Sequence, residues 1–220
     1  MDTIEKVDPR SLRELSFLHA AYLYYVAGAG AADLPFIVGL TFDRGIGVIT
    51  AKNREMEEKI LGAEDGAALG KALAEGLETI RYYTDLQEAA VGSVGKLVPA
   101  GDKAAAGACL TRYRKRTDEF GGLLMRQFRE TASAKARAAS LKIDMPVTPD
   151  GSWEKEAATL VPKRFQPGTL FLEEIPPSEW KEIDSSPHWW SATNWASASY
   201  WWVDGRRNLN EIKKLCELEA

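Results

Sequence analysis

Residues 102–142 read DKAAAGACLTRYRKRTDEFGGLLMRQFRETASAKARAASLK. Large apolar side chains recur in this stretch at helical spacing: Leu110, Tyr113, Phe120, Leu124 and Phe128. Residues at these steps share one face of an α-helix. The segment Pro99-Ala100-Gly101-Asp102 just before it combines a helix breaker with a capping residue. The sequence therefore predicts a long amphipathic helix that begins near residue 102.

Two stretches upstream have the same periodicity. Residues 65–98 place apolar and small polar side chains on one face: Leu69, Leu73, Leu77, Ile80, Tyr83 or Thr84, and Gln87. Residues 10–27 do the same with Leu12, Leu15, Leu18, Tyr22 and Tyr25, after Asp8-Pro9, which is a good helix start. The sequence predicts two more helices here, and the first of them should be a packed one.

Residues 36–50, FIVGLTFDRGIGVIT, fit two structures. Their β-branched residues and glycines lower helix propensity and are compatible with a short strand pair. The charged end that follows, KNREMEEKI at 52–60, is strongly helical, and Asp33 with Pro35 can begin a helix. We expect a helix through about Leu61, with the strand pair as the competing interpretation.

The amino-acid composition of the chain changes at Ile143. Seven prolines follow within the next 45 residues: Pro146, Pro149, Pro162, Pro167, Pro176, Pro177 and Pro187. Such a density predicts an extended surface connector rather than a regular domain. The predicted fold is mainly α-helical: a helical bundle over 1–142, a proline-rich connector over 143–178, and a small aromatic helical module over 179–220.

Composition limits the function classes. The 220 residues are 45% hydrophobic and 27% charged, which is typical of a globular protein. The net charge of −4 disfavours a strongly basic nucleic-acid binder, although local basic patches can still occur. An acidic N-terminus without a basic segment ahead of an apolar run argues against a signal peptide, and the run at 17–32 is too polar to span a bilayer. Cys109 and Cys216 have no metal-binding spacing and are expected to be reduced thiols. We expect a cytoplasmic protein with no membrane partner.

Catalytic constellations are missing from the sequence. A metal site needs clustered His, Cys, Asp and Glu, and only two histidines occur, His19 and His188. Neither cysteine has a histidine neighbour, and no G-x-S-x-G, P-loop or dinucleotide fingerprint appears. We predict no catalytic residue, no metal ligand and no cofactor in this chain.

Two parts of the chain are candidate binding surfaces. The basic run Arg112, Arg114, Lys115 and Arg116 could face phosphates, although such a run is more often a solvated helix face paired with nearby carboxylates. Seven aromatic side chains gather near the end of the chain: Trp180, Trp189, Trp190, Trp195, Tyr200, Trp201 and Trp202. They are interpreted first as the core of a small module. Because adjacent Trp189 and Trp190 can hardly be buried alike, a ligand or partner surface of His188, Trp189, Trp190 and Trp195 is also predicted.

Residues 2–9, DTIEKVDP, resemble the stretch that follows the last metal-binding histidine of M28-type zinc aminopeptidases. In that family a His-Thr pair, an Asp-Thr and "DKVDP" lead into a long helix, and this chain starts at the Asp-Thr. The resemblance implies a parent that removes N-terminal residues with two zinc ions. It also implies that this chain is its non-catalytic C-terminal part, with a metallopeptidase catalytic domain or a second copy as partner.

Residues 200–215, YWWVDGRRNLNEIKKL, resemble the turn and helix that begin winged-helix-like modules. Asn208 would cap a final helix over 209–218. A complete winged helix needs a further helix and a hairpin, so an incomplete module and a plain turn-helix both remain open. The sequence thus predicts an accessory domain of an M28-like peptidase that shapes a cleft, oligomerises or binds a partner. The alternative is a stand-alone helical interaction module, with nucleic acid as one partner class.

Overall fold

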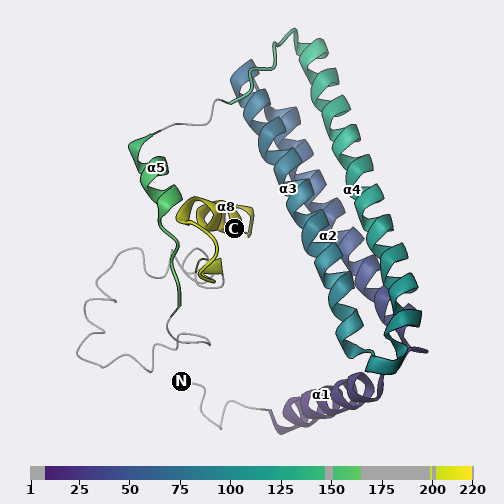
Figure 1. The fold of residues 1–220 in the computed structure, drawn as a ribbon. Helices are drawn as coiled ribbons and strands as arrows, with labels where there is room; N and C mark the ends of the chain where they lie inside the picture. The colour runs from purple at the N-terminus through teal and green to yellow at the C-terminus, as the bar shows by residue number, and fades with distance from the viewer. Residues whose placement is uncertain (1–7, 147–150, 165–198, 200–201, 220) are drawn as a thin grey trace. The chain divides into compact units, whose positions relative to one another are not determined.

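The computed structural model describes residues 8–146, 151–164, 199 and 202–219. Within these residues it contains six α-helices, and the predicted mainly α-helical class is confirmed (Figure 1). The chain divides into two compact units, one ending at Pro146 and the other starting at Val147.

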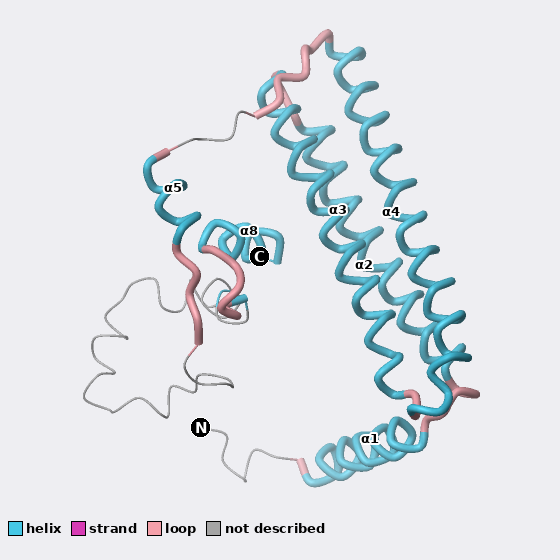
Figure 2. The backbone as a smooth tube through the Cα atoms, in the orientation of Figure 1, coloured by secondary structure: helices cyan, strands magenta, loops and turns pink. Residues whose placement is uncertain are grey.

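The first unit is built on three long helices that pack along their lengths (Figure 2). They are α2 (Leu34–Gly62), α3 (Gly66–Val94) and α4 (Lys103–Ala139). Short connections join them, including two 3-10 turns at Gly95–Leu97 and Ala100–Asp102, so neighbouring helices run antiparallel. The predicted bundle is therefore present, and its helix boundaries lie within a few residues of those expected from the sequence.

Two groups of buried side chains hold the bundle together. The larger group centres on Phe128 of α4, which is fully buried beside side chains of α2 and α3: Ile49, Ile60, Leu69 and Ile80. The second group joins the start of α2 to the end of α3 through Leu34, Val38, Val91 and Val94. Burial of apolar surface on this scale is the main stabilising contribution to such a bundle.

Residues 36–50 are helical, so the competing prediction of a strand pair is wrong. Val38 and Ile49 are fully buried on the face of α2 that meets the other two helices. Tertiary packing of an apolar helix face outweighs the modest β preference of Val and Ile. By length and composition α2 could also cross a membrane, a test that core helices pass as well.

The segment after α4 returns across the start of α3. Ser140 ends α4 in the left-handed conformation, with φ of 54°, and the amide of Leu141 donates to the carbonyl of Ala136 at 2.9 Å. The amide of Asp144 then donates to the carbonyl of Gly66 at 3.0 Å. A Cβ at Gly70 would lie 1.8 Å from the carbonyl oxygen of Asp144, so this close crossing requires glycine.

The second unit contains α5 (Ser152–Thr159) and α8 (Leu209–Glu219). Asn210 Nδ2 donates to the carbonyl of Glu154 at 2.7 Å, and the amide of Leu209 donates to the carbonyl of Leu160 at 3.0 Å. Ala157, Ile212 and Cys216 are buried in this unit.

The prediction of an extended connector over 143–178 missed α5. Gly151 precedes the helix and Leu160 follows it, so its eight residues fit between the prolines at 149 and 162. Residues 151–164 of this segment belong to the same compact unit as α8, whereas residues 143–146 belong to the first unit. The winged-helix form of the C-terminal module stays a prediction, since most of residues 179–220 lie outside the described residues.

Candidate interaction surface

Helix α1 (Pro9–Gly28) begins as the sequence predicts. Asp8 is the N-cap, and its Oδ1 accepts a hydrogen bond from the amide of Arg10 at 3.0 Å. The hydroxyl of Ser11 donates to the second carboxylate oxygen at 2.8 Å, and these bonds lower the pKa of Asp8. The cap satisfies the amide of Arg10, one of the groups that a helix start leaves open.

The packing of α1 differs from the prediction. Not one of its residues is buried, although its apolar face was expected to be packed. We call this face the α1 stripe: Leu12, Leu15, Leu18, Tyr22 and Tyr25, whose side chains are between 41% and 66% exposed. The opposite side is apolar as well, with Phe17 at 72% and Tyr24 at 84% exposure. A helix that is apolar on most sides is normally buried in protein or lipid. The apolar surface of α1 is therefore expected to be covered by a binding partner.

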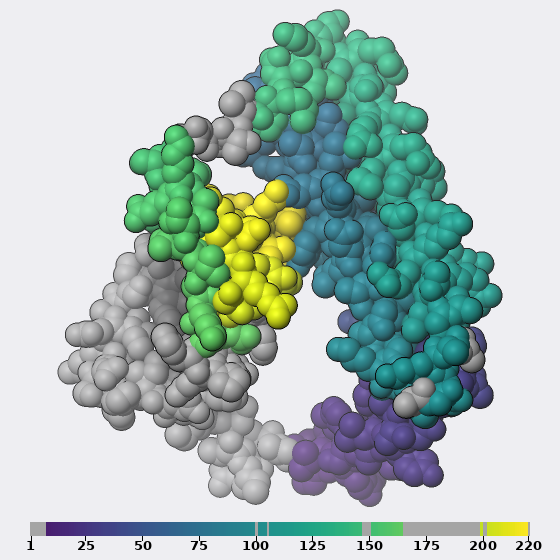
Figure 3. All heavy atoms as spheres, in the orientation of Figure 1, coloured from purple at the N-terminus to yellow at the C-terminus, as the bar shows by residue number. Residues whose placement is uncertain are grey.

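A hydrogen-bonded turn over 29–33 joins α1 to the bundle. The amide of Gly30 donates to Asp33 Oδ2 at 3.0 Å, and the amide of Asp33 donates back to the carbonyl of Gly30 at 3.1 Å. Ala29 and Leu34 at its two ends are buried. The turn fixes where α1 leaves the bundle, and α1 does not lie along the three long helices (Figure 1). Much of its surface is open in the space-filling view, where it is purple (Figure 3).

A second uncovered surface lies between α2 and α3, and we call it the α2/α3 groove. It is a hollow of about 340 Å³ with mainly apolar walls. Its lining includes Thr41, Arg44, Val48, Tyr83, Leu86 and Ala90. Val48 and Leu86 are exposed at its rim. On the neighbouring surface of α2, Phe36 and Leu40 are exposed too, so apolar surface continues toward the start of that helix.

The groove has polar groups at fixed positions. Gln87 Nε2 donates to the main-chain carbonyl of Thr41 at 2.6 Å, which ties the two walls together. Arg44 is exposed at the edge. A few polar groups in a mainly apolar hollow favour an amphipathic occupant.

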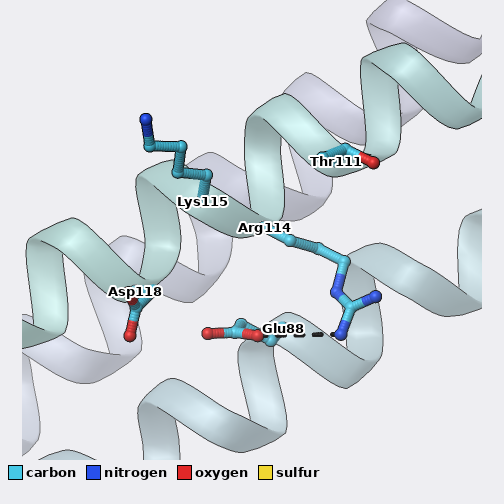
Figure 4. A pocket seen from close by; sticks show the side chains of 5 residues that line it. All are labelled: Glu88, Thr111, Arg114, Lys115 and Asp118. Carbon is cyan, nitrogen blue, oxygen red and sulfur yellow. Dashed lines mark ion pairs between the residues drawn. The ribbon is translucent and has the colours of Figure 1, made fainter.

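A charged hollow of about 380 Å³ lies between α3 and α4 (Figure 4). Arg114 of α4 reaches Glu88 of α3, with 3.8 Å between Nη2 and Oε2. Partial burial is the main cause that raises the pKa of Glu88, and the carboxylate of Asp118 raises it further. Arg114 lowers this pKa and Asp85 raises it, both by less than Asp118 does. Both signs of charge line the hollow, so it has no strong preference for an anion or a cation.

The four basic residues singled out in the sequence have different partners. Arg112 and Arg116 both lie over the ring of Tyr113, at 5.6 and 5.5 Å from its centroid. Arg114 pairs with Glu88, and Lys115 lies 3.6 Å from a carboxylate oxygen of Glu119 on the next turn. Each cation thus has a neighbour on the protein, and a phosphate-binding face formed by all four stays a prediction.

The other predicted surface, His188, Trp189, Trp190 and Trp195, lies outside the described residues. Of the C-terminal aromatic cluster, Trp202 is described: its Nε1 donates to a carboxylate oxygen of Glu219 at 3.2 Å, and Arg207 lies 4.9 Å from its ring centroid. His19 Nδ1 lies 2.8 Å from the carbonyl of Leu15 on its own helix. No group of three potential metal ligands occurs among the described residues.

Both cysteines are free.

Sequence reasoning identified the side chains of the α1 stripe but missed that they would be left uncovered. It also missed the α2/α3 groove, for which Gly45 in the apolar first half of α2 was the available signal. Comparisons with protein-family models, with curated proteins and with solved structures found no match to this chain.

Proposed function

We propose that this chain is a helical interaction module that binds a protein partner through the α1 stripe. The observation that carries the proposal is α1 itself, a capped helix of 20 residues with no buried residue and an apolar face. Covering large apolar side chains is the main favourable contribution to association. Tyrosines at positions 22 and 25 add hydroxyl groups, which interfaces use for hydrogen bonds at an apolar surface.

An accessory role in an M28-like peptidase is one setting for such a module. There the partner of the stripe would be a catalytic domain that holds two zinc ions. This setting rests on the resemblance of residues 2–9, of which residues 2–7 lie outside the described residues. Nucleic-acid binding has less support, because Arg112, Arg114, Lys115 and Arg116 each have a neighbour on the protein.

Photo-crosslinking in the cells that produce the protein tests the proposal. The full chain would carry p-benzoylphenylalanine in place of Tyr22, on the stripe, or in place of Tyr24, on the opposite side, as a matched control. We expect the probe at position 22 to give a discrete protein–protein adduct, and the probe at position 24 to give much less of it. Adducts confined to other residues of the same molecule, or to lipid alone, would contradict the proposal.

A further inference from the structure

We propose that the partner is a second copy of this chain. The α1 stripe of each copy lies in the α2/α3 groove of the other, and the two contacts are related by a two-fold axis. The inference rests on the proposed function, because it names the partner of the same stripe. One chain supplies both surfaces, so a symmetric pair covers two stripes and two grooves without any other molecule.

The turn over 29–33 is the reason why α1 fills the groove of a neighbour and not its own. Folding back would have to break the two hydrogen bonds between Gly30 and Asp33. It would also disturb the bond of 3.1 Å from the amide of Phe36 to the carbonyl of Asp33, which starts α2. A neighbour's groove can be entered with this turn intact. Short connections that hold an element away from its own domain favour exchange between copies.

The dimensions of the two surfaces are compatible. The groove has two helical turns on each wall, at 41–48 of α2 and 83–90 of α3, or about 10 Å. The stripe extends from Leu12 to Tyr25, about 20 Å along its helix axis. Its central side chains, Leu18 and Tyr22, would enter the hollow. The remaining stripe residues would then lie on the exposed apolar surface next to it, at Phe36 and Leu40.

The area also suits a stable dimer. An aromatic side chain buries on the order of 200 Å² when it is fully covered, and the five stripe side chains are 41–66% exposed. Taking the same value as an upper figure for leucine, the stripe offers roughly 500 Å². The exposed apolar side chains on and beside the groove, Val48, Leu86, Phe36 and Leu40, are 41–61% exposed and offer roughly 400 Å² by the same estimate. Each copy contributes both surfaces, roughly 900 Å² when all of it is covered, against about 800 Å² per partner in a standard interface.

The charges favour protein over a lipid surface. Helices that lie on membranes usually carry many Lys and Arg residues on the polar face. In α1 the basic residues are Arg10 and Arg13, and Arg10 Nε pairs with Glu14 at 3.2 Å. The whole chain has a net charge of −4. The groove also places Arg44 where an acyl chain could not bond to it, whereas a tyrosine hydroxyl could.

The test uses the purified full chain with p-benzoylphenylalanine in place of Tyr22. Equal amounts of ¹⁴N- and ¹⁵N-labelled protein are mixed, equilibrated and irradiated, and cross-linked peptides are identified by mass spectrometry. We expect cross-links from α1 to residues 36–48 or 83–90 that join one light and one heavy peptide. Sedimentation equilibrium of the unmodified chain should show a dimer at the same concentration.

Two results would overturn the inference. The first would also overturn the proposed function, whereas the second would not. Cross-links to the groove that join only peptides of the same isotope would show α1 folded back on its own bundle, and the proposed function would fail as well. A monomer without cross-links to the groove, whether or not it binds lipid vesicles, would exclude the dimer. In that case a protein adduct in the cellular experiment would leave the proposed function intact, with a different partner.

Matched variants in the groove add a second readout. Ala90→Trp fills the hollow, whereas Ala89→Trp places the same side chain on the exposed side of α3 next to it. We expect Ala90→Trp to weaken dimerisation by at least about tenfold and Ala89→Trp to leave it within about twofold. Equal dissociation constants for the two variants, with both folded by circular dichroism, would contradict the assignment of the groove.

Discussion

Gln87 of α3 crosses α2 directly over Gly45 and donates from Nε2 to the main-chain carbonyl of Thr41 at 2.6 Å. A Cβ at position 45 would lie 1.7 Å from Cδ of Gln87. The hydrogen bond between the two helices therefore depends on the missing side chain. This relationship sets the floor of the α2/α3 groove, which Gly45 and Gln87 both line.

Gly45→Ala should lower the free energy of unfolding by about 1–2 kcal/mol, because Gln87 must move and its hydrogen bond is lost. Gly47→Ala is the control: it lies on the same helix, and its Cβ would meet no atom within 4 Å. The control should raise stability by about 0.5–1 kcal/mol through helix propensity alone. Urea unfolding followed by circular dichroism measures both, and a Gly45→Ala protein as stable as the control would refute the expectation.

Phe128 is the largest fully buried side chain of the bundle. Phe128→Ala removes its contacts with α2 and α3 and should cost about 3–5 kcal/mol of stability. Phe17→Ala removes the same side chain from the exposed side of α1, opposite the stripe, and should change stability by no more than about 0.5 kcal/mol. Urea unfolding of the two variants, read at the denaturant midpoints, measures both losses of stability. Similar losses at both positions would mean that α1 is packed more tightly than the structure shows.

Glu88 should make the stability of the bundle depend on pH. Its pKa is raised in the folded state, so the folded chain binds this proton more tightly than the unfolded chain. Stability contributed by this group is fully present below its unfolded pKa, about 4.3, and falls as the pH rises through the higher folded value. Glu88→Gln should remove that fall. The ion pair with Arg114 is partly exposed, so its loss should cost little.

Thermal unfolding of the wild type and of Glu88→Gln between pH 4 and pH 7 checks this expectation. The variant should become more stable relative to the wild type as the pH rises. Glu14→Gln is a control for a carboxylate on α1 that pairs with Arg10 at the surface. A stability difference between Glu88→Gln and wild type that stays constant over this pH range would contradict the assignment.

The two cysteines should react at different rates in the folded protein. Cys216 is buried in α8, and burial raises the pKa of its thiol, so little thiolate is formed or reached by a reagent. Cys109 on α4 is partly exposed. Iodoacetamide at neutral pH should modify Cys109 first, and unfolding in urea should make the rates similar. Faster modification of Cys216 in the folded chain would show that the second unit is open.

Local patterns in the sequence predicted most of the bundle. Leu124 and Phe128 at helical spacing gave α4, and Asp8-Pro9 gave the start of α1 because a side-chain cap is a local interaction. The ambiguity of residues 36–50 could not be settled locally. Helix or strand there depends on whether Val38 and Ile49 meet α3 and α4, which lie far away in the sequence.

The candidate surfaces were less accessible to sequence reasoning. Leu12, Leu15, Leu18, Tyr22 and Tyr25 predict an apolar face, but periodicity does not reveal whether the same chain covers it. The α2/α3 groove needs Gln87 to lie over Gly45, a contact between residues 42 positions apart. Helix α5 was missed because its eight residues lie in a proline-rich stretch and carry few large apolar side chains to give a period.

Hydrogen–deuterium exchange of the α1 amides addresses the role of the stripe. The full chain would be measured at two concentrations about a hundredfold apart, beside Leu15→Ser/Leu18→Ser on the stripe and Phe17→Ser/Tyr24→Ser on the opposite side. If a second copy covers the stripe, protection of 12–25 should rise with concentration in the wild type and in the opposite-side variant, and be lost in the stripe variant. Exchange of α1 that is the same at both concentrations in the wild type would contradict this account.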